Sequence, residues 1–218
     1  WNEPNLAREW SGFQPDPAGY VELLKACYIG IKTADPDAIV ISAGLAPTGN
    51  GLPEAMPDAD YLVALYEAGA SPYFDVLGVH APGFKYPPEM SPAEVADDTG
   101  GHRFFCFRHV EDLRDIMVHY GDGHKQIAVL EMGWTIDPIH PNYAWFAVTP
   151  EQQADYLVRA FAYAKANWQP WIGLMTVISI ADPSWTENDE QYWWAITEPG
   201  WPETRVRPAY EALRDMEK

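Results

Sequence analysis

Basic side chains are scarce in this sequence. Its 218 residues include 14 lysines and arginines against 32 aspartates and glutamates, which gives a formal net charge of -18 at pH 7. A surface with this excess of negative charge repels the phosphates of nucleic acids and the anionic headgroups of membranes. The composition therefore disfavours nucleic acid and membrane surfaces as partners.

Long apolar runs and cysteines are scarce as well. The longest apolar stretch, residues 171–181, is too short to cross a bilayer and is predicted to form a buried strand. The only two cysteines, Cys27 and Cys106, fit neither a disulfide framework nor a metal site and are predicted to be buried thiols. The histidines from His102 to His124 show no ligand pattern, so no metal site is expected.

The sequence also lacks the glycine-rich turns of nucleotide-binding folds. Neither G-x-G-x-x-G nor a Walker motif occurs, so a doubly wound nucleotide-binding sheet is not expected. Instead, short β-branched runs alternate with segments of helical periodicity. Strands are predicted at 38–45, 74–80, 126–131 and 171–179, and helices at 17–34, 58–68, 103–120, 150–168 and 208–216.

This alternation predicts an α/β fold with parallel strands and helical crossovers, and without a nucleotide-binding turn it favours a (β/α) barrel. The opening segment WNEPN fits such a fold, because Pro4 biases Glu3 toward extended backbone and makes Trp1–Glu3 the predicted end of a strand. Functional residues of barrels gather at the carboxyl ends of the strands. Glu3, His80 and Glu131 all lie at predicted strand ends.

Two glutamates on one rim can together hydrolyse a glycosidic bond. In the predicted arrangement, Glu3 is the acid/base that protonates the leaving oxygen, and Glu131 is the nucleophile that attacks the anomeric carbon. The acid needs a raised pKa, and the charge of the second carboxylate supplies part of that shift. Asn2, beside Glu3, is a candidate donor to the sugar 2-hydroxyl. A single strand-end glutamate is more often structural, so residue type and spacing alone leave this chemistry open.

Other rim residues have both a functional and a structural interpretation. His80 would orient the nucleophile or bind a hydroxyl, or else it is a satisfied structural group. Trp134 would border the sugar or cap the barrel rim, and Trp185 would be a sugar platform or part of a solvated loop. Several of the 10 tryptophans and 12 tyrosines lie in predicted loops such as PNYAWFAV, where they suit stacking on sugars or packing of the loops onto the barrel.

Four segments carry a resemblance to known enzymes. WNEPN followed by a helix resembles the acid/base segment after the fourth strand of clan A glycoside hydrolases, and VLEMGWT resembles their nucleophile segment after the seventh strand. FDVLGVHAPGF is similar to their sixth strand with its rim histidine, and WWAITEPGWPETRVRPAYEAL is similar to their closing stretch. The nearest pattern is that of glycoside hydrolase family 39 and its relatives, whose acid/base motif also reads WNEPNL.

This resemblance implies a retaining β-glycosidase or endoglycanase that acts on a carbohydrate by double displacement, with no metal or organic cofactor. It also implies a TIM (β/α)8 barrel in which residues 1–218 form the C-terminal part of one catalytic domain, with the first three β/α units outside the sequence. The expected partner of such an open sheet is the N-terminal half of the barrel or a second copy of the chain. The location of the protein stays open, secretion included, because a chain that starts at a strand end holds no information on a signal peptide.

Two other interpretations stay open. One is a barrel that binds carbohydrate without catalysis, which would predict replacement of one carboxylate, and here both Glu3 and Glu131 are present. The other is a structural or interaction fragment, which would associate or partly unfold in isolation.

Overall fold

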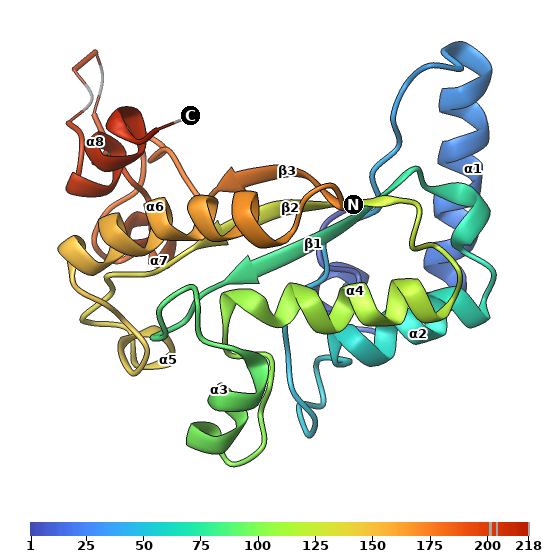
Figure 1. Ribbon diagram of the computed structural model, residues 1–218, viewed down its shortest axis with the longest axis horizontal. Coiled ribbons are helices and arrows are strands. Elements are labelled where there is room, and N and C mark those ends of the chain that lie inside the picture. The colour runs from blue at the N-terminus through green and yellow to red at the C-terminus, as the bar shows by residue number, and fades with distance from the viewer. Residues whose placement is uncertain (201, 204, 218) are drawn as a thin grey trace. The chain divides into compact units, whose positions relative to one another are not determined.

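The computed structural model describes residues 1–200, 202–203 and 205–217; Trp201 and Thr204 of the closing stretch, and Lys218, lie outside the described residues. In this part of the chain the protein is α/β, with strands β1 (Val76–Pro82), β2 (Gln126–Gly133) and β3 (Ile172–Val177) in one parallel sheet of order β1-β2-β3 (Figure 1). None of the described helices has the length and apolar character needed to cross a membrane. The α-helices are α1 (Pro17–Ala34), α2 (Asp58–Glu67), α3 (Pro92–Thr99), α4 (Val110–His119), α5 (Pro141–Ala144), α6 (Pro150–Asn167), α7 (Glu190–Trp194) and α8 (Pro208–Asp215), and the 3-10 helices are η1 (Ala7–Trp10), η2 (Ser71–Tyr73) and η3 (Phe107–His109).

The folded chain groups into two compact units, and all three strands pass from the first unit into the second. The first unit carries α1, α2 and α4, and the second carries α3 and α5 to α8. The first unit consists of Trp1–His80, His109–Leu130 and Gln169–Met175, and the second of Ala81–Arg108, Glu131–Trp168 and Thr176–Lys218.

The helix α1 begins where the sequence predicts. The Asp16 side chain accepts a hydrogen bond from the Gly19 N–H (2.9 Å), and Pro17 occupies the first helical position. Both features satisfy or remove amide donors that the first turn of a helix leaves unpaired. The buried residues of α1 are Tyr20, Val21 and Leu24.

The burial predicted for Cys27 is wrong, whereas that of Cys106 is confirmed. Cys27 lies on α1 and is exposed. Helical spacing places Cys27 on the same face as Tyr20, but packing covers only the first turns of α1, and Ile31 near its end is 41% exposed. Periodicity therefore predicts which residues share a face and not how far along the helix that face is covered.

Residues 38–45 do not form the predicted regular strand. Ile41 makes an isolated parallel bridge to Val76 at the start of β1. Further along β1, the Gly78 N–H donates to the hydroxyl of Ser42 (2.9 Å). The Ser42 N–H still donates to the Val76 carbonyl (3.1 Å), so the backbone ladder is interrupted only beyond that bond, where the side chain of Ser42 accepts in place of a backbone carbonyl.

The predicted strand end at Trp1–Glu3 is also corrected. Glu3 has a φ of 41°, in the left-handed region, where the sequence predicts extended backbone. The Glu3 carbonyl accepts from the Leu6 N–H (2.9 Å), so the chain turns tightly over residues 3–6. This turn outweighs the local bias that Pro4 imposes.

The strand β3 is less buried than the prediction for residues 171–181. Leu174 in β3 is 45% exposed, and Ile180 beyond it is 59% exposed. The strand ends the described sheet, with β2 as its neighbour on one side. An apolar run in the sequence indicates burial but cannot distinguish a central strand from an edge strand.

The helix predicted over 103–120 begins later than expected. The structure has the short η3 first, and α4 starts only at Val110. Phe104 and Phe105 pack against each other with ring centroids 4.0 Å apart. Successive side chains of an α-helix point about 100° apart around its axis, so this contact between neighbours does not fit a helix.

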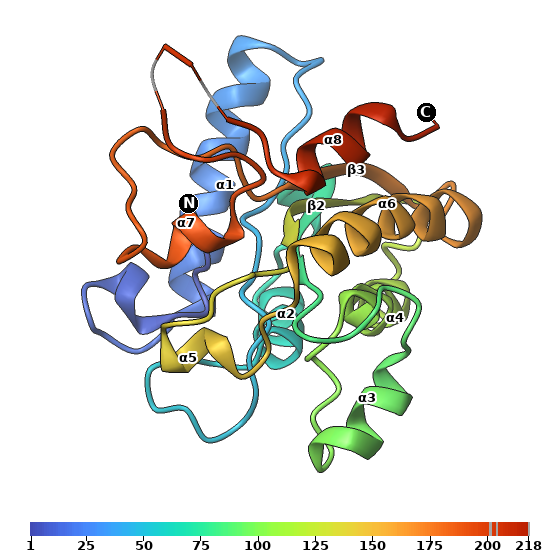
Figure 2. The same cartoon turned by 90° about the vertical axis from the view of Figure 1, so that its left-hand side faces the viewer.

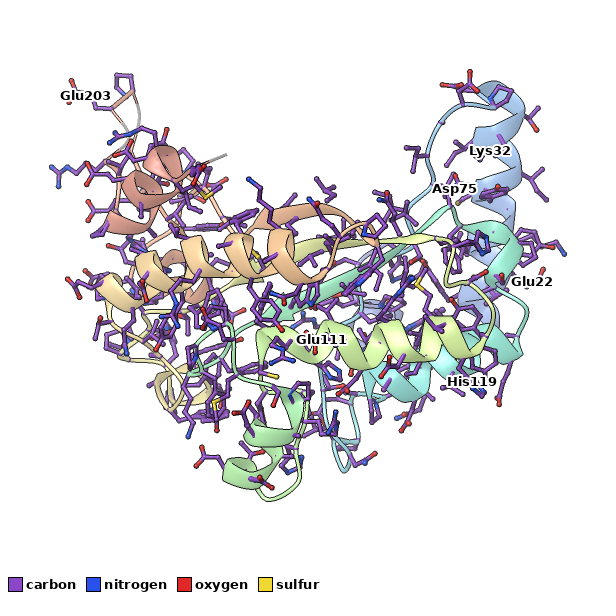
Figure 3. All side chains as sticks on the ribbon, in the orientation of Figure 1. Glu22, Lys32, Asp75, Glu111, His119 and Glu203 are labelled. Carbon is purple, nitrogen blue, oxygen red and sulfur yellow. The ribbon has the colours of Figure 1, made fainter. Side chains whose placement is uncertain are left out.

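Asp75, just before β1, connects three segments of the first unit. Its carboxylate forms an ion pair with Lys32 of α1 at 2.8 Å (Figure 3) and accepts from the Val40 N–H at 2.8 Å. The Tyr28 hydroxyl also donates to it (3.3 Å). Burial acts to raise the pKa of Asp75, but the hydrogen bond from Lys32 and the other donors outweigh it and lower the pKa. The ionised carboxylate of Asp75 thus joins α1 and the segment around Val40 to the start of β1.

In the second unit, α6 and α8 lie side by side (Figure 2). The α6 helix begins with a capping box, in which the Thr149 side chain accepts from the Gln152 N–H and the Gln152 side chain accepts from the Thr149 N–H. Pro150 occupies its first position. These residues explain why the predicted helix over 150–168 is confirmed to within one residue.

His109 lies between two carboxylates at the start of α4 in the first unit. Its Nε2 is 2.9 Å from Asp58 Oδ2, and its Nδ1 is 3.1 Å from Asp112 Oδ2. Burial acts to lower the pKa of His109, but the two carboxylates outweigh it and raise the pKa to about 9. A charged imidazolium therefore joins the starts of α2 and α4.

We expect Asp112→Asn to destabilise the protein by about 2 kcal/mol near pH 6 and by less near pH 9. The folded-state pKa of His109 lies above its ordinary value of 6.5, so the stabilisation by the ion pairs is complete below about pH 6.5 and is lost as the pH rises toward 9. Urea unfolding at both pH values measures this difference. Asp115→Asn, at an exposed position of α4, is the control, and a loss for Asp112→Asn that does not change with pH would contradict the role of His109.

Candidate active site

Asn5 fixes the turn that carries Glu3. Its side chain is fully buried. The Nδ2 group donates to the carbonyls of Ala46 (2.8 Å) and Met56 (3.0 Å), and Oδ1 accepts from the Ala46 N–H (2.9 Å). Because buried amides that lose their partners are costly, these bonds determine the position of the WNEPN segment.

Glu3 lies between a buried histidine and an exposed arginine. Its Oε1 is 3.1 Å from Nδ1 of His80 in β1, and its other oxygen forms an ion pair with Arg8. The side chain of His80 is 3% exposed and that of Glu3 is 13% exposed, whereas Arg8 is 65% exposed. His80 is therefore the buried partner of Glu3, and Arg8 is the exposed one.

Gly44 provides the space in which Glu3 and His80 meet. A Cβ atom on Gly44 would lie only 2.2 Å from Nε2 of His80. The Gly44 carbonyl accepts from the Glu3 N–H (3.0 Å), and the adjacent Leu45 carbonyl accepts from the His80 N–H (3.3 Å). One short segment therefore positions the backbones of both residues.

These partners lower the pKa of Glu3. Burial acts to raise it, but the hydrogen bond and charge of His80 and the charge of Arg8 outweigh burial. The direction is opposite to the raised pKa expected for a general acid. The sequence pattern misses this effect because the role of Arg8 depends on the turn that brings it back to Glu3.

Glu3 and His80 together offer a carboxylate oxygen and an imidazole nitrogen, two ligands that divalent metal ions accept. The cation of Arg8 already lies on the same carboxylate, and it would repel a second cation. The surroundings of Glu3 in this unit therefore suit proton transfer better than metal binding.

In the second unit, Glu131 and Trp134 lie at and just beyond the carboxyl end of β2. Glu131 is half-buried. Trp134 is fully buried, and its Nε1–H donates to the Tyr86 carbonyl (2.8 Å). Its ring lies so close to Gly83 that a Cβ there would be 1.9 Å from the indole. These contacts are structural, and a sugar contact by Trp134 stays a prediction that its burial opposes.

Two other candidate residues lie nearer the surface. Asn2 is exposed beside Glu3 in the first unit, and Trp185 is half-buried in the loop after β3 in the second. The loop turns at this point, where the Trp185 N–H donates to the Asp182 carbonyl (3.1 Å). The expected sugar contacts of Asn2 and Trp185 stay predictions.

Asn5, Arg8 and Gly44 are not among the predicted site residues, although each has a recognisable signal in the sequence. Asn5 and Arg8 follow Glu3 by two and five residues in WNEPNLAREW, where a turn brings polar side chains back to the carboxylate. Gly44 interrupts a β-branched run, which is a known mark of close backbone approach.

Comparison with protein-family models gives no match, and comparison with curated protein sequences gives none either.

The fold is similar to parts of solved glycosidase structures. A glucosidase from Croceicoccus marinus matches with a TM-score of 0.58 and 15% identity, over 91% of this chain and 35% of that one. The family 51 α-L-arabinofuranosidase AbfB from Bifidobacterium longum matches with a TM-score of 0.53 and 14% identity, over 92% and 41% of the two chains. A GH128 exo-β-1,3-glucanase from Aureobasidium namibiae matches with a TM-score of 0.51 and 15% identity, over 91% of this chain and 60% of that one.

This chain thus spans between 35% and 60% of the length of these structures. At identities of 14 to 15% the likeness shows a shared fold. This likeness does not show that the chain belongs to glycoside hydrolase family 39.

Replacement of Gly44 by alanine should weaken the contact between Glu3 and His80. The new methyl group overlaps the imidazole, so we expect a loss of about 1 to 3 kcal/mol in the free energy of unfolding. The pKa of Glu3, measured by NMR titration of its carboxyl carbon, should rise as the contact with His80 weakens.

The matched control is Gly30→Ala in α1, where nothing lies within 4 Å of the added Cβ. Alanine in a helix interior stabilises by about 0.5 to 1 kcal/mol relative to glycine. Equal stability of the two variants, with an unchanged Glu3 pKa, would show that Gly44 does not hold the pair.

Proposed function

We propose that the chain is part of the catalytic domain of a retaining β-glycosidase or endoglycanase built on a (β/α)8 barrel. The observation that carries the proposal is the hydrogen bond between Glu3 and His80, which places a partly buried carboxylate near the carboxyl end of β1. The fold shared with glycosidases supports it. The resemblance of WNEPN and VLEMGWT to the two catalytic segments of clan A enzymes supports it as well.

Glu131 is the proposed second carboxylate. It lies two residues before the end of β2, as His80 lies two residues before the end of β1. The two strands are parallel neighbours in the sheet, and parallel strands end at the same edge. We therefore assign Glu3 and Glu131 to one substrate. Retention of configuration needs carboxyl groups about 5 to 5.5 Å apart.

In the first proposed step, a carboxylate oxygen of Glu131 attacks the anomeric carbon while the bond from that carbon to the leaving oxygen breaks. Glu3 gives its proton to the leaving oxygen. In the second step, water attacks the anomeric carbon, Glu3 takes a proton from the water, and the bond to Glu131 breaks. The sugar leaves with its original configuration because the carbon is inverted twice.

The lowered pKa of Glu3 fits the second step better than the first. His80 and Arg8 favour the anion that accepts a proton from water. In the proposed free enzyme, the negative charge of Glu131 acts against His80 and Arg8, although the pKa of Glu3 stays below its ordinary value. Once Glu131 is bound to sugar it is neutral, and the pKa of Glu3 falls further. The same residue can then serve as acid and base in turn.

His80 is a positioning residue in this scheme, because it holds the Glu3 carboxylate by its Oε1 atom. Asn2 is the proposed donor to the sugar 2-hydroxyl, and Trp185 is a proposed platform for the sugar. The substrate is a carbohydrate, and no metal or organic cofactor takes part in the steps above.

One observation favours the alternative of a barrel that binds carbohydrate without catalysis. The ion pair with Arg8 stabilises Glu3 as an anion, and a permanent anion can accept hydrogen bonds from hydroxyls but cannot protonate a leaving group. Activity measurements separate the two functions.

We expect the full-length protein to hydrolyse aryl β-glycosides, with aryl β-xylosides the first to test, and to keep its activity in a chelator. Glu131→Ala should abolish turnover, and azide should restore it with inverted configuration because the anion enters the vacated space. Glu3→Ala should slow substrates with poor leaving groups by about 10²-fold or more. Azide should then give a product of retained configuration, read by proton NMR.

Glu22→Ala, at an exposed position of α1 (Figure 3), is the control and should keep full activity. The same anomer from both variants would overturn the assignment of roles. Binding of oligosaccharides without hydrolysis of any glycoside in the panel would favour the non-catalytic alternative.

A further inference from the structure

An aromatic cluster in the second unit is not used by the proposed steps. It consists of rings from the connection between β1 and α4, which includes α3, and from the connection between β2 and α6, which includes α5. Phe84 is at its centre, with ring centroids 4.9 Å from Phe105 and 5.1 Å from Phe146. Phe84 is buried and has a φ of 52°, a left-handed conformation that is unfavourable for a bulky residue. Backbone strain of this kind persists where surrounding contacts require it and is common at binding sites.

Trp145 is the exposed member of this cluster. Its side chain is 51% exposed, although tryptophan gains much from burial. Phe105 and Phe146 meet it at steep angles, with centroids 5.3 Å and 4.9 Å away and interplanar angles of 88° and 79°. Its Nε1–H donates to the Asn142 carbonyl (3.1 Å). The indole is therefore fixed in orientation while about half of it faces solvent.

The position of Trp145 relates it to the proposed reaction. Trp145 follows α5 in the connection between β2 and α6, and β2 carries Glu131 near its carboxyl end. Phe84 lies in the loop between β1 and α3. In the second unit, the helix α5 just before Trp145 lies beyond the arrowhead of β2 (Figure 1). The cluster thus belongs to the edge of the sheet at which the substrate is proposed to bind.

We propose that Trp145 is a stacking platform for a sugar ring of a neutral, linear oligosaccharide. This inference rests on the proposed function and extends it to a subsite made by the connection between β2 and α6. A fixed aromatic face suits the C–H face of a pyranose, and little conformational entropy is lost on binding because the ring is already held. The exposed His102, whose ring lies 5.7 Å from that of Phe105, adds a polar group to the aromatic cluster. The net charge of -18 opposes polyanionic glycans.

The test is calorimetric titration of the full-length protein with linear hexasaccharides of β-1,4-xylose, β-1,4-glucose and β-1,3-glucose, in a Glu131→Ala background that prevents turnover. Trp145→Ala should weaken binding of the best ligand about tenfold or more, and Trp145→Phe should weaken it less because part of the aromatic face remains. With Glu131 present, Trp145→Ala should raise KM and leave kcat unchanged, since a platform binds substrate and transition state alike.

Phe13→Ala is the matched control, because Phe13 is an aromatic residue of the first unit that is 76% exposed. It should not change hexasaccharide affinity. If Trp145→Ala lowers the melting temperature but leaves the affinity unchanged, the ring packs against protein and the proposal is overturned. Hydrolysis of aryl glycosides with no effect of Trp145→Ala on any hexasaccharide would likewise refute the platform while leaving the proposed function intact. Binding that depends on Trp145 without any hydrolysis would support the platform and refute the enzyme.

Discussion

The hydrogen bond between Glu3 and His80 joins residues 77 positions apart in the sequence, and the surrounding contacts hold both of its ends. Asn5 fixes the turn that carries Glu3 through three hydrogen bonds to backbone groups. Gly44 accepts from the Glu3 N–H and leaves space for the imidazole. A partly buried carboxylate can keep one orientation only when its partners are fixed in this way. The chemistry proposed for this chain depends on that orientation.

The protonation of Glu3 is a balance of opposing effects. Burial disfavours the anion, and His80 and Arg8 favour it strongly enough to lower the pKa. A general acid needs the opposite shift, and in the proposed mechanism the charge of Glu131 acts in that direction. The two partners differ in exposure, because His80 is buried while Arg8 is exposed.

The helices α1 and α6 could be predicted from sequence because their signals are local. Asp16 and Pro17 mark the start of α1, and Thr149 and Pro150 mark that of α6. Some wrong predictions concern distant segments, such as the Ser42 hydroxyl that interrupts a strand and the exposure of Cys27. The tight turn at Glu3 and the late start of α4 are local errors, in which the bias of Pro4 and the helical periodicity each predict the wrong element. In the candidate site, the motif containing Glu3 is visible in the sequence, whereas Arg8 and Gly44 acquire their roles only through the fold.

The pH dependence of kcat/KM for Arg8→Met in the full-length protein tests whether Glu3 protonates the leaving oxygen. Loss of the Arg8 cation raises the pKa of Glu3. If Glu3 must be protonated when the glycosidic bond breaks, activity is lost as the pH rises through that pKa, so the alkaline limb should move up by about half a pH unit or more while the acidic limb stays. Arg8→Lys keeps the charge and should keep the wild-type profile. An upward shift of the acidic limb instead would mean that Glu3 reacts as an anion, and no shift of either limb would mean that its protonation does not control the reaction. Either result would rule out Glu3 as the acid that protonates the leaving oxygen.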